Sequence, residues 1–219
     1  AANVVASMSG CAGQRCMAAS AMVGVGKIDH IIEKIVAEAK KVVPGQNLGA
    51  VINKESKERI ERYIDEAEKD GAKILVDGRG AIVKGKENGT YVGPTVIDYV
   101  KPEMSVAKEE IFGPVISIMR TNTIDEALEI ENANPYGNAA SVFTQNGGLA
   151  RYIIDHASAG MIGVNVGVPV PREPFSFGGW NESKFGVGDI TGKSSVEFWT
   201  KLKKSTTKWN PEAGVNWMS

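Results

Sequence analysis

The chain has few of the residues that build metal centres and disulfide frameworks. It contains two cysteines, Cys11 and Cys16, and two histidines, His30 and His156. Both cysteines fall near the start of the chain, whereas a secreted disulfide framework spreads more of them along its length, so we expect a reducing, intracellular setting. The cysteines do not form a Cys-x-x-Cys pair, and the histidines lie far from both in sequence. We therefore expect no metal site.

Long apolar runs and a strong net charge are also absent. No apolar run approaches the ~20 residues that a membrane span needs, and the formal net charge is -1. Aliphatic and aromatic residues interrupt the C-terminal lysines, so these lysines indicate a solvated face rather than a phosphate-binding patch. We expect no membrane or nucleic-acid partner. The opening residues lack the basic segment of a signal peptide, which favours the cytoplasm, and a start at Ala1 suggests an internal cut.

Helical and strand-like segments alternate along the chain. Apolar residues at three- and four-residue spacing predict two helices, and two more are predicted from a Thr123–Glu126 capping box and from a fourth apolar segment. Asn53 is the predicted N-cap of the second helix. Short, consecutive apolar runs predict strands that are buried on both faces. The predicted helices span 28–43, 54–70, 123 onward and 149–157, and the predicted strands span 72–76, 91–97, 114–119, 139–143 and 161–166.

This alternation predicts an α/β fold with a mostly parallel sheet. A polar turn at residues 84–89 is expected at the tip of a surface hairpin. Residues 198–203 alternate with period two and predict a strand that pairs outside the domain, with a partner subunit as one option. We therefore divide the chain into a domain at 1–196 and an oligomerisation strand with its tail at 197–219.

Cys16 has the sequence context of a reactive thiol. Small residues precede it, Arg15 adjoins it, and an apolar run at 17–22 predicts a helix that begins just after it. The positive end of a helix dipole and a neighbouring guanidinium both lower the pKa of a thiol, and the thiolate is the nucleophilic form. The alternative is a small buried hydrophobic residue, as most lone cysteines are. These residues alone do not favour the reactive thiol over the buried hydrophobic residue.

Four motifs in order resemble the aldehyde dehydrogenase superfamily. Gly13-Gln14-Arg15-Cys16-Met17-Ala18 is similar to the segment around its catalytic cysteine, and Glu110-Ile111-Phe112-Gly113-Pro114 is similar to its Glu-x-Phe-Gly-Pro signature. Asn134-Pro135-Tyr136-Gly137 with 140–144 resembles the next block, and Phe177-Gly178-Gly179 with Ser183 resembles a block near the C-terminus. Together these motifs cover nearly the whole chain. The first motif and residues 167–177 resemble, more narrowly, the methylmalonate-semialdehyde (malonate-semialdehyde) dehydrogenase family.

The narrower resemblance implies an NAD-dependent oxidation of a carboxylated semialdehyde. The acyl group would form a thioester on Cys16 and pass to coenzyme A, with loss of CO2, in a homodimer or homotetramer. The chain contains no Gly-x-Gly-x-x-Gly element, so we expect the NAD-binding domain to precede Ala1 and the isolated chain to bind NAD incompletely. The alternatives are an ordinary NAD-dependent aldehyde dehydrogenase that yields an acid, and an inactive assembly module.

The resemblance also implies roles for particular residues. Cys16 would be the nucleophile, and its backbone N–H would stabilise the oxyanion. Arg15 would bind the substrate carboxylate in a bidentate manner, or else form a surface or interface salt bridge. Glu110 would accept hydrogen bonds from the nicotinamide ribose, and Phe112 would pack against the same region. Phe177 would line the substrate tunnel.

Four further positions carry open alternatives. Asn165 and Phe175 lie where the family lines its substrate tunnel, and plain core packing is an equal alternative for them and for Phe177. Arg172 and Glu173 would contact a substrate carboxylate or pair with each other. Two positions depart from the superfamily pattern: Cys11 replaces a small residue and is expected to be passive, and Lys184 replaces a common glycine, which leaves the conformation of that turn open.

Overall fold

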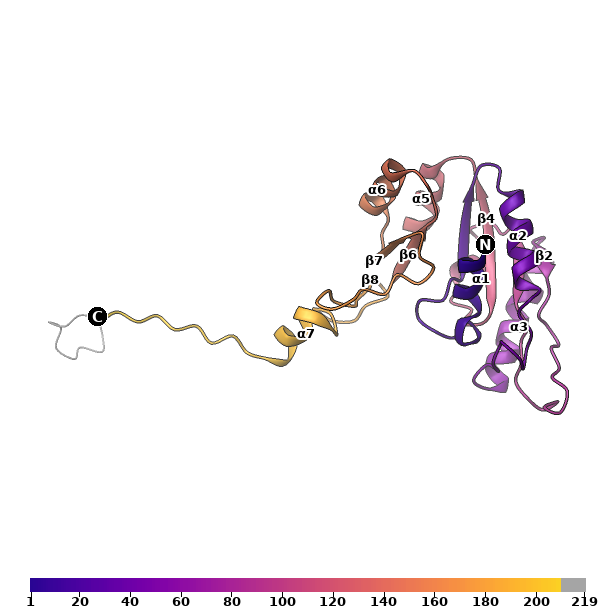
Figure 1. Ribbon diagram of the computed structural model, residues 1–219, viewed down its shortest axis with the longest axis horizontal. Coiled ribbons are helices and arrows are strands. Elements are labelled where there is room, and N and C mark those ends of the chain that lie inside the picture. Colours follow the sequence, from indigo (N-terminus) through magenta and orange to yellow (C-terminus); the bar gives the residue numbers. More distant parts are fainter. Residues whose placement is uncertain (210–219) are drawn as a thin grey trace.

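The computed structural model describes residues 1–209, in which helices and strands alternate along the chain (Figure 1). The elements are α1 (Ala2–Ser9), the 3-10 helix η1 (Gly10–Gly13), β1 (Ala21–Val25), α2 (Asp29–Ala39), α3 (Lys54–Lys69), β2 (Lys73–Val76), β3 (Thr95–Asp98), α4 (Ser105–Lys108), β4 (Val115–Thr121), α5 (Ile124–Ala133), β5 (Tyr136–Gly137), β6 (Ala139–Val142), α6 (Gly147–His156), β7 (Met161–Val164), β8 (Trp180–Asn181) and α7 (Gly192–Trp199).

A four-stranded sheet with the order β1-β4-β3-β2 forms the centre of the fold. β4 pairs in parallel with β1 on one side and with β3 on the other, whereas β2 is antiparallel to β3. This mostly parallel arrangement confirms the predicted α/β class. The turn at residues 84–89 lies, as predicted, in the connection between the antiparallel strands β2 and β3.

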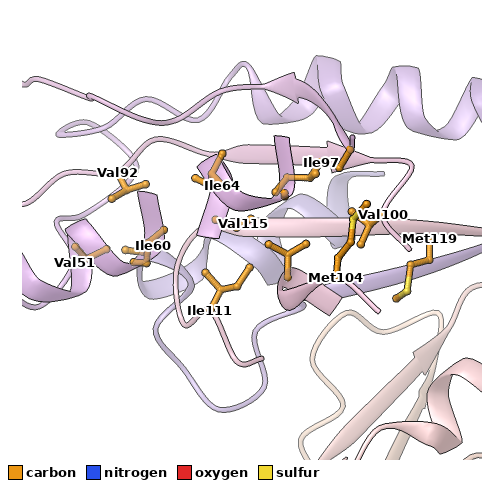
Figure 2. Packing of buried hydrophobic residues seen from close by; sticks show 14 of the residues in the cluster. Val51, Ile60, Ile64, Val92, Ile97, Val100, Met104, Ile111, Val115 and Met119 are labelled. Atoms are coloured by element: carbon orange, nitrogen blue, oxygen red, sulfur yellow. The ribbon is translucent and has the colours of Figure 1, made fainter. Parts of the chain in front are cut away.

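Helices cover both faces of this sheet, so its two central strands are buried almost throughout. Successive side chains of a strand point to opposite faces, and the core divides accordingly. One half packs against α1 and α2, with Val96, Ile116 and Ile118 from the sheet. The other half packs against α3 and the segment around α4, with Ile97, Val115 and Met119 from the sheet (Figure 2).

Side-chain caps fix two of the helix starts that the sequence predicts. The Asn53 side chain accepts a hydrogen bond from the Ser56 backbone N–H at 2.8 Å. Thr123 and Glu126 form the predicted capping box at the start of α5. Helix α2 ends at Ala39, earlier than predicted, and the chain beyond it is held by the Asn47 side chain, which accepts the Val43 N–H at 2.6 Å.

A smaller group of elements follows the sheet. β6 pairs in parallel with β7, and the short strands β5 and β8 pair antiparallel. Helix α5 contacts β1 and β4 of the main sheet, and its Asp125 accepts a hydrogen bond from Tyr152 of α6 at 2.8 Å. Figure 1 shows the chain after α7 running away from the rest of the molecule. The predicted fourth helix and the strands at 139–143 and 161–166 are present here as α6, β6 and β7.

One sequence prediction is wrong, and another is contradicted only at its first residues. No helix follows Cys16: the chain makes a turn and then enters β1, whose residues gain a complete parallel pairing with β4. At 198–203, α7 takes up Phe198 and Trp199, so a strand cannot begin at Phe198; residues 200–209 pair with no strand of the described chain, and pairing of this segment with a partner subunit stays a prediction. Residues 210–219, the rest of the predicted tail, lie outside the described residues.

Within residues 1–209, none of the helices combines the length and the apolar character that a membrane crossing requires. The same residues bring together no group of three or more His, Cys, Asp or Glu side chains that could hold a metal ion.

Candidate active site

Cys16 lies in a turn between η1 and β1, and its thiol is free and exposed. The turn is closed by the Ala18 N–H, which donates to the Arg15 carbonyl at 3.0 Å. The carbonyl of Cys16 itself accepts a hydrogen bond from Asn138 Nδ2 at 2.9 Å. Because no helix begins here, a helix dipole does not act on this thiol. Its position in an exposed, anchored turn leaves it open to a reactant.

The segment that carries Cys16 packs directly against residues 112–114. Gly13 has a φ of 70° and touches the backbone of Gly113, where the β-carbon of any other residue would overlap the Gly113 carbonyl oxygen. The side chain of Gln14 bridges the same region: its Nε2 donates to the Phe112 carbonyl at 3.3 Å, and its Oε1 accepts the Ile52 N–H at 2.9 Å. Two motifs that are about a hundred residues apart in sequence are therefore neighbours.

Arg59 of α3 holds the backbone of the loop that carries Glu110 and Phe112. Arg59 Nη1 donates to the Ile111 carbonyl at 2.6 Å and lies 3.5 Å from the Glu110 carbonyl. Phe112 is half-buried and has a φ of 53°. The Glu110 side chain is exposed, and its carboxylate makes no hydrogen bond or ion pair with the residues described. A free carboxylate of this kind fits the two hydroxyls of a ribose.

Arg15 binds the C-terminal end of α1. Its Nη2 donates to the Ser7 carbonyl at 3.3 Å and to the Ala6 carbonyl at 3.4 Å. A cation at this position stabilises the unpaired carbonyls at a helix C-terminus. The guanidinium covers Gly10 so closely that a β-carbon there would lie 2.6 Å from Nη2. Its Nε is buried and has no hydrogen-bond partner among the described residues. Arg15 is thus partly, not fully, satisfied by α1.

Serine 7 of α1 joins the Cys16 segment to the loop after β7. Ser7 is buried, and its Oγ accepts the Ala19 N–H at 3.1 Å while donating to the Gly167 carbonyl at 2.8 Å. Gly167 also lies against the carbonyl oxygen of Asn3. The proline-rich loop that begins here is therefore fastened to the same helix that Arg15 covers.

The side chains of this proline-rich loop have different surroundings. Phe177 is half-buried and its backbone N–H donates to Thr191 Oγ1 at 2.7 Å, whereas Phe175 is 72% exposed. Asn165 has a structural role, since its Oδ1 accepts the Thr144 N–H and its Nδ2 donates to the Thr144 carbonyl. No ion pair of the described residues joins Arg172 to Glu173; Lys184 pairs with Asp189 at 2.7 Å.

The positive φ values of the Lys184 turn belong to neighbouring residues. Gly186 has a φ of 74° and Gly188 a φ of 80°. Lys184 is not among the described residues with a positive φ, so a lysine is accommodated where the superfamily commonly has glycine.

Two residues of this site were not predicted from the sequence. Arg59 looks like an ordinary charged residue of an amphipathic helix, and Asn138 sits inside a recognised motif without a signal of its own. Only the folded chain brings Arg59 to the Glu110–Phe112 loop and Asn138 to Cys16.

Burial raises the pKa of one carboxyl in α5, that of Glu131. The pKa of Glu131 is raised above its ordinary value of 4.5, because desolvation outweighs the hydrogen bond from the Ser158 N–H. The Asn132 side chain accepts the same N–H at 2.7 Å, so two acceptors share one donor.

Comparison with known families agrees with this arrangement. The profile of the aldehyde dehydrogenase family matches residues 1–205. The chain belongs to the aldehyde dehydrogenase family. The matched residues include the turn that carries Cys16, the loop of Glu110 and Phe112, and the C-terminal loop of Phe177.

Several members of the aldehyde dehydrogenase family are similar to this chain over nearly all of its length. The mitochondrial, acylating methylmalonate-semialdehyde/malonate-semialdehyde dehydrogenase of Rattus norvegicus is 46% identical over 216 residues, which are 96% of this chain and 40% of the relative. Malonate-semialdehyde dehydrogenase 2 of Geobacillus kaustophilus is 42% identical, over 94% of this chain and 44% of the relative. The chain therefore spans less than half of these relatives.

Solved structures of the aldehyde dehydrogenase family share the fold. Methylmalonate-semialdehyde dehydrogenase from Oceanimonas doudoroffii has a TM-score of 0.92 and 41% identity, and the match covers 97% of this chain and 45% of that one. A structure from Sinorhizobium meliloti 1021, assigned to the same enzyme and complexed with NAD, has a TM-score of 0.92 and 38% identity over 97% of this chain and 45% of that one.

Proposed function

We propose that this chain carries the nucleophile of an NAD-dependent, coenzyme A-acylating oxidation of methylmalonate or malonate semialdehyde. The observation that carries the proposal is the exposed Cys16 thiol, held in an anchored turn against the loop of Glu110 and Phe112. A nucleophile and a candidate cofactor contact are thereby neighbours in one site. The similarity to acylating semialdehyde dehydrogenases supports the choice of substrate.

The chemistry of Cys16 follows from its thiol and its backbone. The thiolate attacks the aldehyde carbon, forming a C–S bond while the carbonyl electrons move onto oxygen. The Cys16 N–H is a donor for this oxyanion. The Arg15 carbonyl, which belongs to the same peptide group, is fixed by the Ala18 N–H. The orientation of the donor is therefore set before the substrate arrives.

NAD, when bound, supplies the acceptor for the hydride that leaves the substrate carbon. The residues of this chain that would hold it are Glu110, through its exposed carboxylate, and Phe112, through its ring. Arg59 and Gln14 hold the backbone of that loop in place. The similar structure from Sinorhizobium meliloti is complexed with NAD, which supports NAD as the cofactor.

The acyl group on Cys16 then passes to coenzyme A. The sulfur of the coenzyme A thiol bonds to the acyl carbon, the bond to the Cys16 sulfur breaks, and the thiol proton goes to Cys16. In the decarboxylation, the bond between the carboxylate carbon and the α-carbon breaks, CO2 leaves, and the α-carbon takes up a proton from water, which gives propionyl-CoA or acetyl-CoA. Support for coenzyme A comes from the word "acylating" in the names of the similar enzymes.

Arg15 and Phe177 are the proposed substrate contacts. Arg15 adjoins the nucleophile in the sequence, and its guanidinium carries the positive charge that a substrate carboxylate requires. To bind that carboxylate, the guanidinium would turn away from the Ala6 and Ser7 carbonyls at the end of α1. Phe177 is half-buried in the loop that Ser7 fastens to α1. Its ring offers an apolar wall for the carbon chain of the substrate.

We also propose that the protein is a homodimer or homotetramer that acts in the cytoplasm or the mitochondrial matrix. Large apolar side chains at the end of the described chain support an assembly, since isolated monomers seldom expose such a group together. Phe198 is 66% exposed, Trp199 81%, Leu202 84% and Trp209 90%.

The requirement for coenzyme A tests the proposed reaction. With methylmalonate semialdehyde and NAD, we expect NADH formation to depend on coenzyme A and propionyl-CoA to accumulate. Formation of a carboxylic acid at the same rate without coenzyme A would instead assign an ordinary aldehyde dehydrogenase. Absence of any NADH formation, with a Cys16 thiol that iodoacetamide labels no faster than free cysteine, would assign an assembly module.

Matched cysteine variants test the nucleophile. Cys16→Ser should abolish the reaction and the thioester, while Cys11→Ser should keep both. Both cysteines are exposed and free, so the pair controls for general effects of thiol removal. Equal losses in the two variants would reject Cys16 as the nucleophile.

A further inference from the structure

The two peptide groups that flank Cys16 are fixed by different parts of the chain. The Arg15 carbonyl, in the peptide before Cys16, accepts the Ala18 N–H within the turn. The Cys16 carbonyl, in the peptide after it, accepts Asn138 Nδ2 from a residue 122 positions further along the chain. Cys16 belongs to no helix or strand. Its backbone orientation therefore depends on one local and one distant hydrogen bond.

The chemistry of the contact determines what residue 138 must supply. A backbone carbonyl only accepts hydrogen bonds, so the side chain that meets it must present a donor. Asparagine does this with Nδ2, whereas the carboxylate of an aspartate of the same shape would present only acceptors. The contact therefore distinguishes two nearly isosteric residues.

Asn138 is itself seated by the C-terminal loop. The preceding residue, Gly137, pairs with Trp180 across β5 and β8, and its N–H donates to Ser183 Oγ at 3.1 Å. A β-carbon on Gly179 would lie 3.0 Å from Asn138 Cα and 3.1 Å from its Oδ1. Gly179 and Ser183 of the C-terminal motif thus hold residues 137 and 138 in the position from which the Asn138 amide reaches Cys16.

We propose that Asn138 is a positioning residue of the active site: it holds the peptide after Cys16 and so directs the thiol toward the substrate carbon. The proposal rests on the proposed function, since it assigns Cys16 as the nucleophile. Asn138 acts through the backbone of Cys16 and touches no reacting atom. A misdirected nucleophile lowers the rate of the chemical step and leaves substrate binding largely intact.

Hydrogen exchange measures the contact without any need for activity. In Asn138→Ala, which removes the donor without adding a charge, the amides of residues 14–18 should exchange about fivefold faster, as expected for the loss of one hydrogen bond. Asn138→Asp should give at least the same increase. The amides of β3 and β4 should stay unchanged in both variants, which shows that the fold is retained.

Asn134→Ala is the matched control. It removes a hydrogen bond of the same loop, from the Tyr136 N–H to Asn134 Oδ1 at 2.9 Å, that does not involve Cys16. This variant should leave exchange at residues 14–18 within about twofold of the wild type. An equal increase in Asn134→Ala and Asn138→Ala would overturn the proposal, because loosening of the loop would then explain the effect.

Kinetics on the preparation that oxidises the semialdehyde provide the second readout. In Asn138→Ala, kcat should fall about tenfold or more while KM for the semialdehyde stays within about twofold. A rise in KM at constant kcat, or unchanged exchange at residues 14–18, would overturn the positioning role. If the wild type forms no NADH, the proposed function fails, and the exchange experiment still decides whether Asn138 holds the Cys16 turn.

Discussion

Gly13 touches the backbone of Gly113, and no side chain lies between the two residues. The contact joins the segment of the nucleophile to the segment of the candidate cofactor contact, and Gln14 adds its two hydrogen bonds beside it. Both the small size of glycine and its freedom at positive φ are needed at residue 13. Unfolding measurements on glycine variants can therefore separate the contribution of small size from that of the positive φ.

Gly13→Ala should lower the free energy of unfolding by about 3 kcal/mol. The left-handed backbone costs an alanine about 1 kcal/mol, and overlap with the Gly113 carbonyl adds about 2 kcal/mol. Gly26→Ala is the control, because Gly26 has a φ of 73° and no atom within 4 Å of an added β-carbon. It should lose only about 1 kcal/mol. Equal losses in urea unfolding would show that the close contact contributes nothing.

Arg59→Ala should weaken NAD binding more than aldehyde binding. The variant removes the donor that holds the Ile111 carbonyl and frees the loop of Glu110 and Phe112. We expect KM for NAD to rise about fivefold, from the loss of one charge-assisted hydrogen bond, with KM for the aldehyde nearly constant. Arg62→Ala, on the same helix, removes a guanidinium that pairs with Glu66 and lies over the ring of Tyr63, away from the Glu110–Phe112 loop, and should change neither constant. A parallel rise in both constants would contradict the role of Arg59.

Arg15→Ala should affect stability and substrate selectivity separately. Loss of the guanidinium from the end of α1 should cost about 1 kcal/mol, measured by thermal unfolding. If Arg15 binds the substrate carboxylate, kcat/KM should fall about a hundredfold for methylmalonate semialdehyde. For propanal, which lacks the carboxylate, it should fall much less. Equal losses for both aldehydes would leave Arg15 only its contact with α1.

Glu131 should make the protein less stable as the pH rises. Its pKa is raised in the folded state, so the folded protein binds the proton more tightly than the unfolded chain does. The resulting stability is complete below the ordinary glutamate pKa of 4.5 and is lost as the pH rises through the folded value. Glu131→Gln keeps an acceptor for the Ser158 N–H and removes the titration. Its stability relative to the wild type should therefore increase from pH 4 to pH 7, and a constant difference would contradict the assignment.

Features that depend on nearby residues could be predicted from the sequence. The caps at Asn53 and Thr123 satisfy backbone donors only a few positions away, and both are present. The runs that became β3 and β4 are apolar on consecutive positions because these strands are central and covered on both faces. The motif order likewise predicted the family, and the structure brings Cys16 and the Glu110–Phe112 loop together.

Features that depend on distant partners could not be predicted. Residues 17–22 are apolar enough for a helix, but β1 forms there because β4 offers it a parallel partner a hundred residues later. Asn138 and Arg59 act on backbone carbonyls far along the chain, and no spacing rule connects them. The Phe198–Lys203 alternation fits a strand, yet α7 extends through Trp199 and no strand of the described residues pairs with the remainder.

The hydrogen bonds around Cys16 join segments that lie far apart in the sequence. Ser7 bonds to a carbonyl 160 residues away and the Cys16 carbonyl bonds to a residue 122 away, so the surroundings of the nucleophile have a very high contact order. During synthesis, α1 and the Cys16 turn emerge before Asn138 and Gly167, so these bonds can close only after the later residues have been made. Cys16 is therefore synthesised well before the residues that orient its turn.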